Sequence, residues 1–217
     1  MLTRYLSKMH METLKVKVCG LNKKQNILDV IAAGADLIGL IFFDKSPRSV
    51  EKGDVDKSFI RELSIKKVGV FVNATEDQVV EIALNYQLDF LQLHGDESPQ
   101  LCKNLKERGY KILKAVSVFT ESDLNQISDY EDKIDYFLFD TKGKNRGGNG
   151  VKFDWDILKN YSLKTPFLLS GGISLEDASA VSSLDLHKLE GVDINSGFES
   201  SPGNKKIEEV RAFIENV

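Results

Sequence analysis

The stretch that decides the fold is LIGLIFF, Leu37 to Phe43, the longest apolar run in the chain. A strand with one solvated face alternates apolar and polar residues, whereas a strand that is buried on both faces is apolar at nearly every position. This segment is therefore expected to lie in a parallel sheet that helices cover on the outside. Its seven residues fall far short of the roughly 20 that cross a membrane, so we expect no transmembrane segment.

Similar short apolar runs recur along the chain, and longer amphipathic segments separate them. In one of these, Thr75 to Asn85, apolar residues repeat at helical spacing behind Thr75, which is a suitable N-cap. Alternation of strands and helices favours a parallel sheet with a helical outer layer. The eight predicted strands cover residues 15–19, 37–43, 67–72, 90–93, 112–118, 136–139, 166–169 and 191–194.

Eight strand-and-helix repeats predict an α/β protein with a single-domain (β/α)8 TIM barrel over residues 15–217. Because Met9 and Met11 precede the first predicted strand, residues 1–14 are expected to be a disordered N-terminal extension or the result of a misplaced start. They lack the apolar stretch of a secretory signal, and a transit peptide is the weaker alternative. The alternative fold is an open doubly wound sheet. That fold usually has about five or six strands, and neither of its phosphate-binding glycine motifs occurs in this chain.

Composition narrows the classes of function. The hydrophobic fraction of 41% and the charged fraction of 29% are typical of a globular protein. The formal net charge of -4 offers no general attraction for polyanions, so we expect neither nucleic acid nor a membrane as a partner. We expect a cytoplasmic protein, and in a reducing compartment its two cysteines, Cys19 and Cys102, should not form a disulfide.

In a barrel of this kind the reactive groups lie where strands end and loops begin. Cys19 ends the first predicted strand, His94 follows the fourth and Asp140 follows the sixth. Two loops rich in small residues, SGGIS after strand seven and NSGFESSPG after strand eight, offer backbone N–H groups that suit an anion. Because these two loops are the usual phosphate site of the fold, we expect a phosphorylated small molecule as ligand. The plainer explanation for either loop alone is a tight turn.

The strand ends together resemble those of the phosphoribosylanthranilate isomerase family, and the resemblance runs from about Lys15 to the end of the chain. Each motif is weak alone, but nine in order on the expected strand ends form a specific pattern. They are KVCGL, GADLIGLIF, KSPR, VGVFVN, LQLHG, FDT, GGNGVKFDW, LSGGI and VDINSG. Two positions depart from the family pattern: Asn195 stands where serine is common, and Asn149 where serine or threonine is more frequent.

The resemblance implies an isomerase of tryptophan biosynthesis that converts N-(5-phosphoribosyl)anthranilate to 1-(o-carboxyphenylamino)-1-deoxyribulose 5-phosphate by an Amadori rearrangement. It implies no cofactor and no metal, and we expect a monomer or a homodimer. By resemblance the catalytic residues are Cys19 as base and Asp140 as acid, and substrate is bound by Arg48 and Asp193. For His94, a substrate-binding position at the rim and a helix-capping position in the loop both remain open. The phosphate is expected at Gly171, Gly172, Ser196 and Gly197.

The chemistry of these residue types can be examined directly. An aspartic acid is almost entirely ionised near neutral pH, so an acid role for Asp140 requires surroundings that favour its protonated form. A cysteine base gains from a nearby cation, and Lys17, two residues earlier on the same face of the strand, is the candidate. Cys102 lies in a predicted helical core face and is expected to be a buried hydrophobe. For Lys114, within strand five, a barrel-interior position and a substrate contact both remain open.

Three other classes of function fit a barrel with these loops less well. A histidine-pathway isomerase performs the same rearrangement, but its family carries two phosphate sites and an aspartate at the end of strand one, where this chain has Cys19. A cysteine hydrolase needs a histidine base, and only His94 is placed at the rim. A non-catalytic phosphate-binding barrel would have no use for both Cys19 and Asp140.

Overall fold

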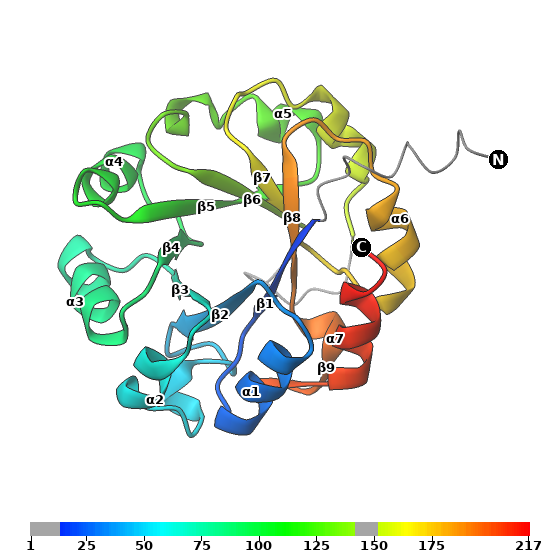
Figure 1. Cartoon of the computed structure of the whole chain (residues 1–217). Helices are drawn as coiled ribbons and strands as arrows, with labels where there is room; N and C mark the ends of the chain where they lie inside the picture. Colours follow the sequence, from blue (N-terminus) through cyan, green and yellow to red (C-terminus); the bar gives the residue numbers. More distant parts are fainter. Residues whose placement is uncertain (1–13, 142–151) are drawn as a thin grey trace, which may run out of the picture.

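Eight parallel strands close into a barrel in the order β1 to β8, and helices surround it (Figure 1). The computed structural model describes residues 14–141 and 152–217, so the predicted extension up to Thr13 and the loop around Asn149 lie outside the described residues. The strands are β1 Lys15–Cys19, β2 Leu37–Phe42, β3 Lys66–Phe71, β4 Phe90–Leu93, β5 Lys111–Val118, β6 Tyr136–Thr141, β7 Phe167–Leu169 and β8 Leu189–Ile194.

The described helices form the outer layer, and a small hairpin follows β8. Helices α1 and α7, from opposite ends of the chain, pack beside each other (Figure 1). The α-helices are α1 Lys24–Ala32, α2 Lys57–Glu62, α3 Glu76–Tyr86, α4 Pro99–Glu107, α5 Glu121–Leu124, α6 Ala178–Ser182 and α7 Ile207–Ile214. The 3-10 helices are η2 Val50–Lys52, η3 Ser128–Tyr130, η4 Trp155–Asn160, η5 Leu175–Asp177 and η6 Ser196–Phe198, and the hairpin strands are β9 Glu199–Ser201 and β10 Asn204–Lys205.

The barrel is closed by parallel pairing of β1 with β8, in which Lys17 lies opposite Asp193. This pairing confirms the predicted barrel and excludes the open sheet. All eight predicted strands are present, and their ends agree with the prediction to within two residues. The helix predicted behind Thr75 is also present as α3, where the Thr75 side chain and Gln78 form a capping box.

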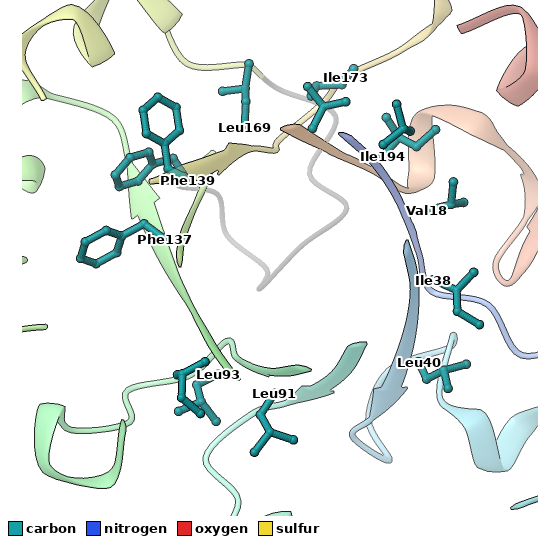
Figure 2. Close-up of a cluster of buried hydrophobic side chains, with 14 of the residues drawn as sticks. Val18, Ile38, Leu40, Leu91, Leu93, Phe137, Phe139, Leu169, Ile173 and Ile194 are labelled. Atoms are coloured by element: carbon teal, nitrogen blue, oxygen red, sulfur yellow. The ribbon is translucent and has the colours of Figure 1, made fainter. Parts of the chain in front are cut away.

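The apolar residues of each strand divide between two cores. Side chains such as Ile38, Leu40 and Phe139 point away from the barrel axis into the layer between sheet and helices (Figure 2). On β2, Leu37 and Ile41 are the residues next to Ile38 and Leu40. Leu37 belongs to the barrel interior, and Ile41 lines the pocket at its C-terminal end. Successive side chains of a strand point to opposite faces, so the apolar run Leu37–Phe43 serves both cores.

The lower part of the barrel interior is apolar. Leu37, Val68 and Leu113 form a buried cluster there, and Phe90 and Tyr136 pack against it. This apolar cluster fills the N-terminal end of the barrel. The polar side chains of the interior therefore lie toward the C-terminal end, where active sites of the fold are found. Within the described ranges, no helix has the length and apolar character that crossing a membrane requires.

Candidate active site

A pocket lies at the C-terminal ends of the strands and contains all the predicted catalytic, substrate-binding and phosphate-binding residues. Strand ends and the loops after them supply its wall, from β1 round to β8. The sequence-predicted residues in its lining are Cys19, Arg48, His94, Asp140, Gly171, Gly172, Asp193, Ser196 and Gly197.

Cys19 ends β1 and is almost completely buried, with 4% of its surface exposed. Its strand neighbour is Gly39, where an added Cβ would lie 2.6 Å from the Cys19 Sγ atom. The glycine in the run LIGLIFF therefore makes room for the thiol. Burial raises the pKa of Cys19 above its ordinary value, although the nearby ammonium groups of Lys17 and Lys205 pull it downward.

Lys17 is the cation beside the thiol, as its place two residues earlier on β1 suggested. Its fully buried ammonium lies 2.7 Å from Asp193 Oδ1, and its charge acts on the Cys19 thiol. Burial alone would lower the pKa of Lys17, but the Asp193 carboxylate and Cys19 outweigh it and the pKa is raised. Lys17 therefore carries a charge, and Asp193 enters the site already paired with it.

Asp140 is held by a chain of hydrogen bonds across the pocket. Its Oδ1 atom accepts the backbone N–H of Thr141 at 2.8 Å, and its Oδ2 atom lies 3.4 Å from His94 Nε2. Gln92 Nε2 donates to His94 Nδ1 at 2.8 Å, so the proton of a neutral imidazole is on Nε2, facing the carboxylate. His94 thus lies in the pocket and contacts the predicted acid directly.

Arg48 reaches the pocket from the loop after β2 and is already paired with a carboxylate. Its Nε atom donates to both oxygens of Glu199, at 3.0 and 2.9 Å, and its Nη2 atom donates to Oε2 at 2.7 Å. The pair uses one edge of the guanidinium and leaves Nη1 outside it. Glu199 in turn accepts from the buried ammonium of Lys205 at 2.6 Å.

The two glycine-rich loops meet at the other side of the pocket. Gly171 and Gly172 have φ angles of +94° and +69°, a left-handed conformation that favours glycine. A Cβ at Gly197 would lie 2.2 Å from the carbonyl oxygen of Ile173, so only glycine permits the close approach of the loops. Ser174 is the N-cap of η5, and its N–H donates to Asp177 Oδ2 at 2.7 Å in a capping box, so the earlier loop residues are left to face an anion.

Sequence reasoning missed part of the site. Gln92 had a usable signal, because it lies two residues before His94 and therefore on the same face of the strand and its extension. Glu199 and Lys205 had none, because their pairing depends on the β9–β10 hairpin, in which they lie opposite each other.

Both alternatives for Lys114 were wrong, because its ammonium lies outside the barrel interior and outside the lining of the pocket. It donates to the carbonyl oxygens of Leu93, Gly95 and Ala115 and pairs with Glu97 at 3.1 Å. It also lies over the Tyr130 ring, 5.9 Å from the centroid. Lys114 therefore secures the loop between β4 and α4 from the helix side.

Comparison with known proteins agrees with this geometry. The family described as N-(5'phosphoribosyl)anthranilate (PRA) isomerase matches residues 16–216. The N-(5'-phosphoribosyl)anthranilate isomerase of Parabacteroides distasonis is 46% identical over 204 residues, which cover 93% of this chain and 92% of that protein. The enzyme of the same name from Phocaeicola vulgatus is 40% identical over 199 residues, covering 92% and 95%.

Solved structures give the same result. Phosphoribosyl anthranilate isomerase from Thermotoga maritima superposes with a TM-score of 0.81 at 32% identity, covering 94% of this chain and 98% of that one. A phosphoribosyl anthranilate isomerase in complex with reduced 1-(o-carboxyphenylamino)-1-deoxyribulose 5-phosphate superposes with a TM-score of 0.77 at 31% identity, covering 94% and 97%. On its barrel, its pocket and its relatives, the chain belongs to the N-(5'-phosphoribosyl)anthranilate isomerase family.

Proposed function

We propose that the pocket converts N-(5'-phosphoribosyl)anthranilate to 1-(o-carboxyphenylamino)-1-deoxyribulose 5-phosphate, with Asp140 as the acid and Cys19 as the base. The protein is an isomerase of tryptophan biosynthesis, as are the relatives that share its family. The observation that carries the division of labour is the presence of the Asp140 carboxyl group and the Cys19 thiol in a single pocket with two glycine-rich loops. The second carboxyl group of the pocket, Asp193, is already paired with Lys17.

The first step opens the ribose ring. The protonated Asp140 carboxyl group gives its proton to the ring oxygen, the bond from that oxygen to C1 breaks, and the nitrogen lone pair forms a C1=N bond. His94 orients the Asp140 carboxyl group, because its Nε2 atom lies 3.4 Å from Asp140 Oδ2. The phosphate and carboxylate charges of the bound substrate favour the protonated form of Asp140 that this step requires. Gln92 fixes the imidazole tautomer from the other side.

The second step removes the proton from C2 of the sugar. The Cys19 thiolate accepts this proton, the C2–H electrons form a C1=C2 bond, and the nitrogen recovers its lone pair. The resulting enolamine tautomerises to the ketose, so the atoms and electrons of substrate and product balance. Lys17 favours the thiolate by its positive charge, against the burial that favours the thiol.

Two anchors hold the ends of the substrate. Arg48 presents its guanidinium to the anthranilate carboxylate, and planar guanidinium groups suit carboxylates. The phosphate meets the backbone of Gly171, Gly172, Ser196 and Gly197 in the loops after β7 and β8, where backbone N–H groups supply donors without a cation. Asp193, held by Lys17, faces the sugar between the two ends.

The histidine-pathway isomerase reaction is the second candidate, and the end of β1 speaks against it. The base position there carries Cys19, not an aspartate. Relatives named N-(5'-phosphoribosyl)anthranilate isomerase span nearly the whole chain, which favours the anthranilate substrate.

The test is a turnover assay with the purified protein as the sole added isomerase. Phosphoribosylanthranilate is generated in situ, and loss of its anthranilate-type fluorescence is followed. Rapid loss that scales with protein concentration is the expected result. If the fluorescence decays at the rate of the protein-free sample while a known family member accelerates it, the proposed function is wrong.

A further inference from the structure

The β9–β10 hairpin forms a buried ionic unit beside Arg48 that the reaction scheme does not use. The side chains of Glu199 and Lys205 are 4% and 0% exposed, and Lys205 Nζ lies 2.6 Å from Glu199 Oε1. Arg48 binds the same carboxylate through two of its nitrogens. Burying the charges of Glu199 and Lys205 is costly unless they are paired, so their presence beside the partly buried Arg48 calls for an explanation.

The unit is fixed in place from several sides. Asn26 of α1 binds the backbone of Lys205 twice, accepting its N–H at 2.8 Å and donating to its carbonyl oxygen at 3.0 Å. Gly203 in the hairpin turn donates its N–H to Glu199 Oε1 at 3.1 Å. The hairpin therefore holds the Glu199 carboxylate at a fixed point, and Arg48 is bound to that point.

The unit is also close to the thiol. Gly20, directly after Cys19, has a φ angle of +76°, and a Cβ there would lie 2.7 Å from both Arg48 Cδ and Asn195 Oδ1. Lys205 donates to that same Asn195 oxygen at 2.7 Å. Asn195 is the residue that departs from the family pattern, and here it connects the hairpin to the turn after the catalytic strand.

The net charge of Arg48, Glu199 and Lys205 indicates what these three groups do in the pocket. Arg48 and Glu199 alone would cancel, because a bidentate pair is neutral overall. Lys205 adds a second cation on the same carboxylate, so the three charged groups together carry one positive charge. Burial lowers the pKa of Lys205 from its ordinary value, and the Glu199 carboxylate opposes that shift. Burial would raise the pKa of Glu199, but Arg48 and Lys205 outweigh it and hold the pKa below its ordinary value, so the carboxylate stays ionised.

We propose that Glu199 and Lys205 are positioning and specificity residues: Glu199 orients the Arg48 guanidinium, and Lys205 preserves the positive charge by which that end of the pocket selects a carboxylated aromatic amine. The proposal rests on the proposed function and deepens it. Glu199 is thus a support for Arg48 and not a competitor of the ligand carboxylate.

The experiment compares two ligands in binding, with no turnover involved. One is the product, and the other is the product analogue that lacks only the ring carboxylate, 1-(phenylamino)-1-deoxyribulose 5-phosphate. Isothermal titration calorimetry gives the ratio of their affinities, which we call the carboxylate preference. Wild-type protein should prefer the carboxylated product. Equal binding of the two ligands by wild type would overturn the proposal, whereas absence of turnover would overturn the proposed function alone.

Lys205→Met tests the charge. It leaves the Arg48–Glu199 pair in place but neutral, so the carboxylate preference should fall about tenfold, equivalent to about 1.4 kcal/mol. Affinity for inorganic phosphate should not change. Lys114→Met is the matched control, because it removes a similarly buried ammonium from a Lys–Glu pair on the outer side of the barrel, and its carboxylate preference should equal that of wild type. An unchanged preference in Lys205→Met overturns the proposal.

Glu199→Gln tests the orientation. It adds net positive charge around Arg48 but removes the carboxylate that aligns the guanidinium, so we expect weaker binding of the carboxylated product and a raised KM. Tighter binding would show that Glu199 competes with the ligand, and would overturn the proposal. If a single variant does not fold, Glu199→Gln/Lys205→Met removes both charges together and keeps the net charge. Its carboxylate preference should still fall, and a wild-type value would contradict the proposal.

Discussion

Two regions of the molecule contain the same three kinds of residue and differ in what those residues can do. On the inner face, Cys19 lies beside the buried pair Lys17–Asp193. On the outer side, Cys102 of α4 lies near the buried pair Lys114–Glu97, and these two charges also act on its pKa. Only the first cysteine lines the pocket.

The difference lies in which groups each lysine acts on. The Lys17 ammonium pairs with Asp193, and its charge acts on the Cys19 thiol, whereas the Lys114 ammonium binds backbone carbonyl oxygens and Glu97. The presence of a cysteine, a lysine and an acid is therefore not enough to form a reactive site. Their positions in the barrel determine whether they react, because only side chains that point inward at the C-terminal ends of the strands contact a ligand.

The largest expected effect separates the two cysteines. Cys19→Ser should lower kcat about 10³-fold, because a hydroxyl group is a far weaker base than a thiol and a general base contributes of this order. Cys102→Ser should leave kcat near wild type. Steady-state kinetics of both variants, with product affinity from calorimetry, check this. The comparison breaks if Cys19→Ser keeps most of its activity.

Alkylation tests the difference between Cys19 and Cys102 independently of kinetics. Product bound in the pocket should protect Cys19 from a thiol reagent, and mass spectrometry of the digested protein identifies which cysteine has reacted. Equal alkylation of Cys19 with and without product would place the thiol outside the ligand's reach.

The acids of the two regions should also differ. Asp140→Asn cannot donate the proton that opens the ring, so kcat should fall by about two to three orders of magnitude, while product affinity stays close to wild type. Glu97→Gln is the matched outer substitution. It leaves the buried Lys114 ammonium without its carboxylate, which should cost about 3 kcal/mol of stability but spare the chemistry. Steady-state kinetics and urea unfolding of both variants test these expectations. Loss of product binding in Asp140→Asn would contradict the assignment of Asp140 as the acid.

Substitution of Lys17 and of Lys114 should show a smaller difference in activity between the two regions. Lys17→Met removes the cation that favours the Cys19 thiolate, so the alkylation rate should rise at higher pH than in wild type and kcat near neutral pH should fall by about 10²-fold. Lys114→Met should change only the stability. Because Lys17→Met leaves Asp193 unpaired, Lys17→Met/Asp193→Asn serves as its folding control. An unchanged pH dependence of alkylation would remove Lys17 from the mechanism.

Much of the fold and the site followed from the sequence, for a physical reason. Strands buried on both faces are apolar throughout, and in a closed barrel the end of each strand faces one pocket. Residues that end a strand, such as Cys19 and Asp140, are therefore placed by the strand assignment alone. Their roles as base and acid remain predictions until the variants are measured.

What the sequence did not predict depends on contacts between distant segments. Arg48, Glu199 and Lys205 come from the loop after β2 and from the hairpin after β8, and their pairing spans about 150 residues. Lys114 was misjudged for another reason. Its strand neighbour is the outward-facing Leu93, and a polar side chain on an outward position of a buried strand is unusual enough to suggest an inward one.

The smallest expected effect concerns stability, and it tests whether Cys102 is only a buried hydrophobe. Burial raises the pKa of Cys102 from an ordinary value of 9.0 to about 11, with Lys114 opposing and Glu97 adding to the shift. The folded state therefore holds this proton more tightly than the unfolded state, and the stabilisation is fully present below the unfolded pKa. Between about pH 9 and about pH 11 the unfolded state binds fewer protons, so stability must fall as pH rises, by about 2 kcal/mol.

Cys102→Ser, which has no thiol to titrate, should lose about that much less over the same range in urea unfolding, whatever its stability at neutral pH. Other groups that titrate there, Cys19 among them, are common to both proteins and cancel in the difference. Parallel decline of wild type and Cys102→Ser would mean that the Cys102 thiol ionises as easily in the folded chain as in the unfolded one, and the contrast between the two cysteine environments would then rest on access to the pocket alone.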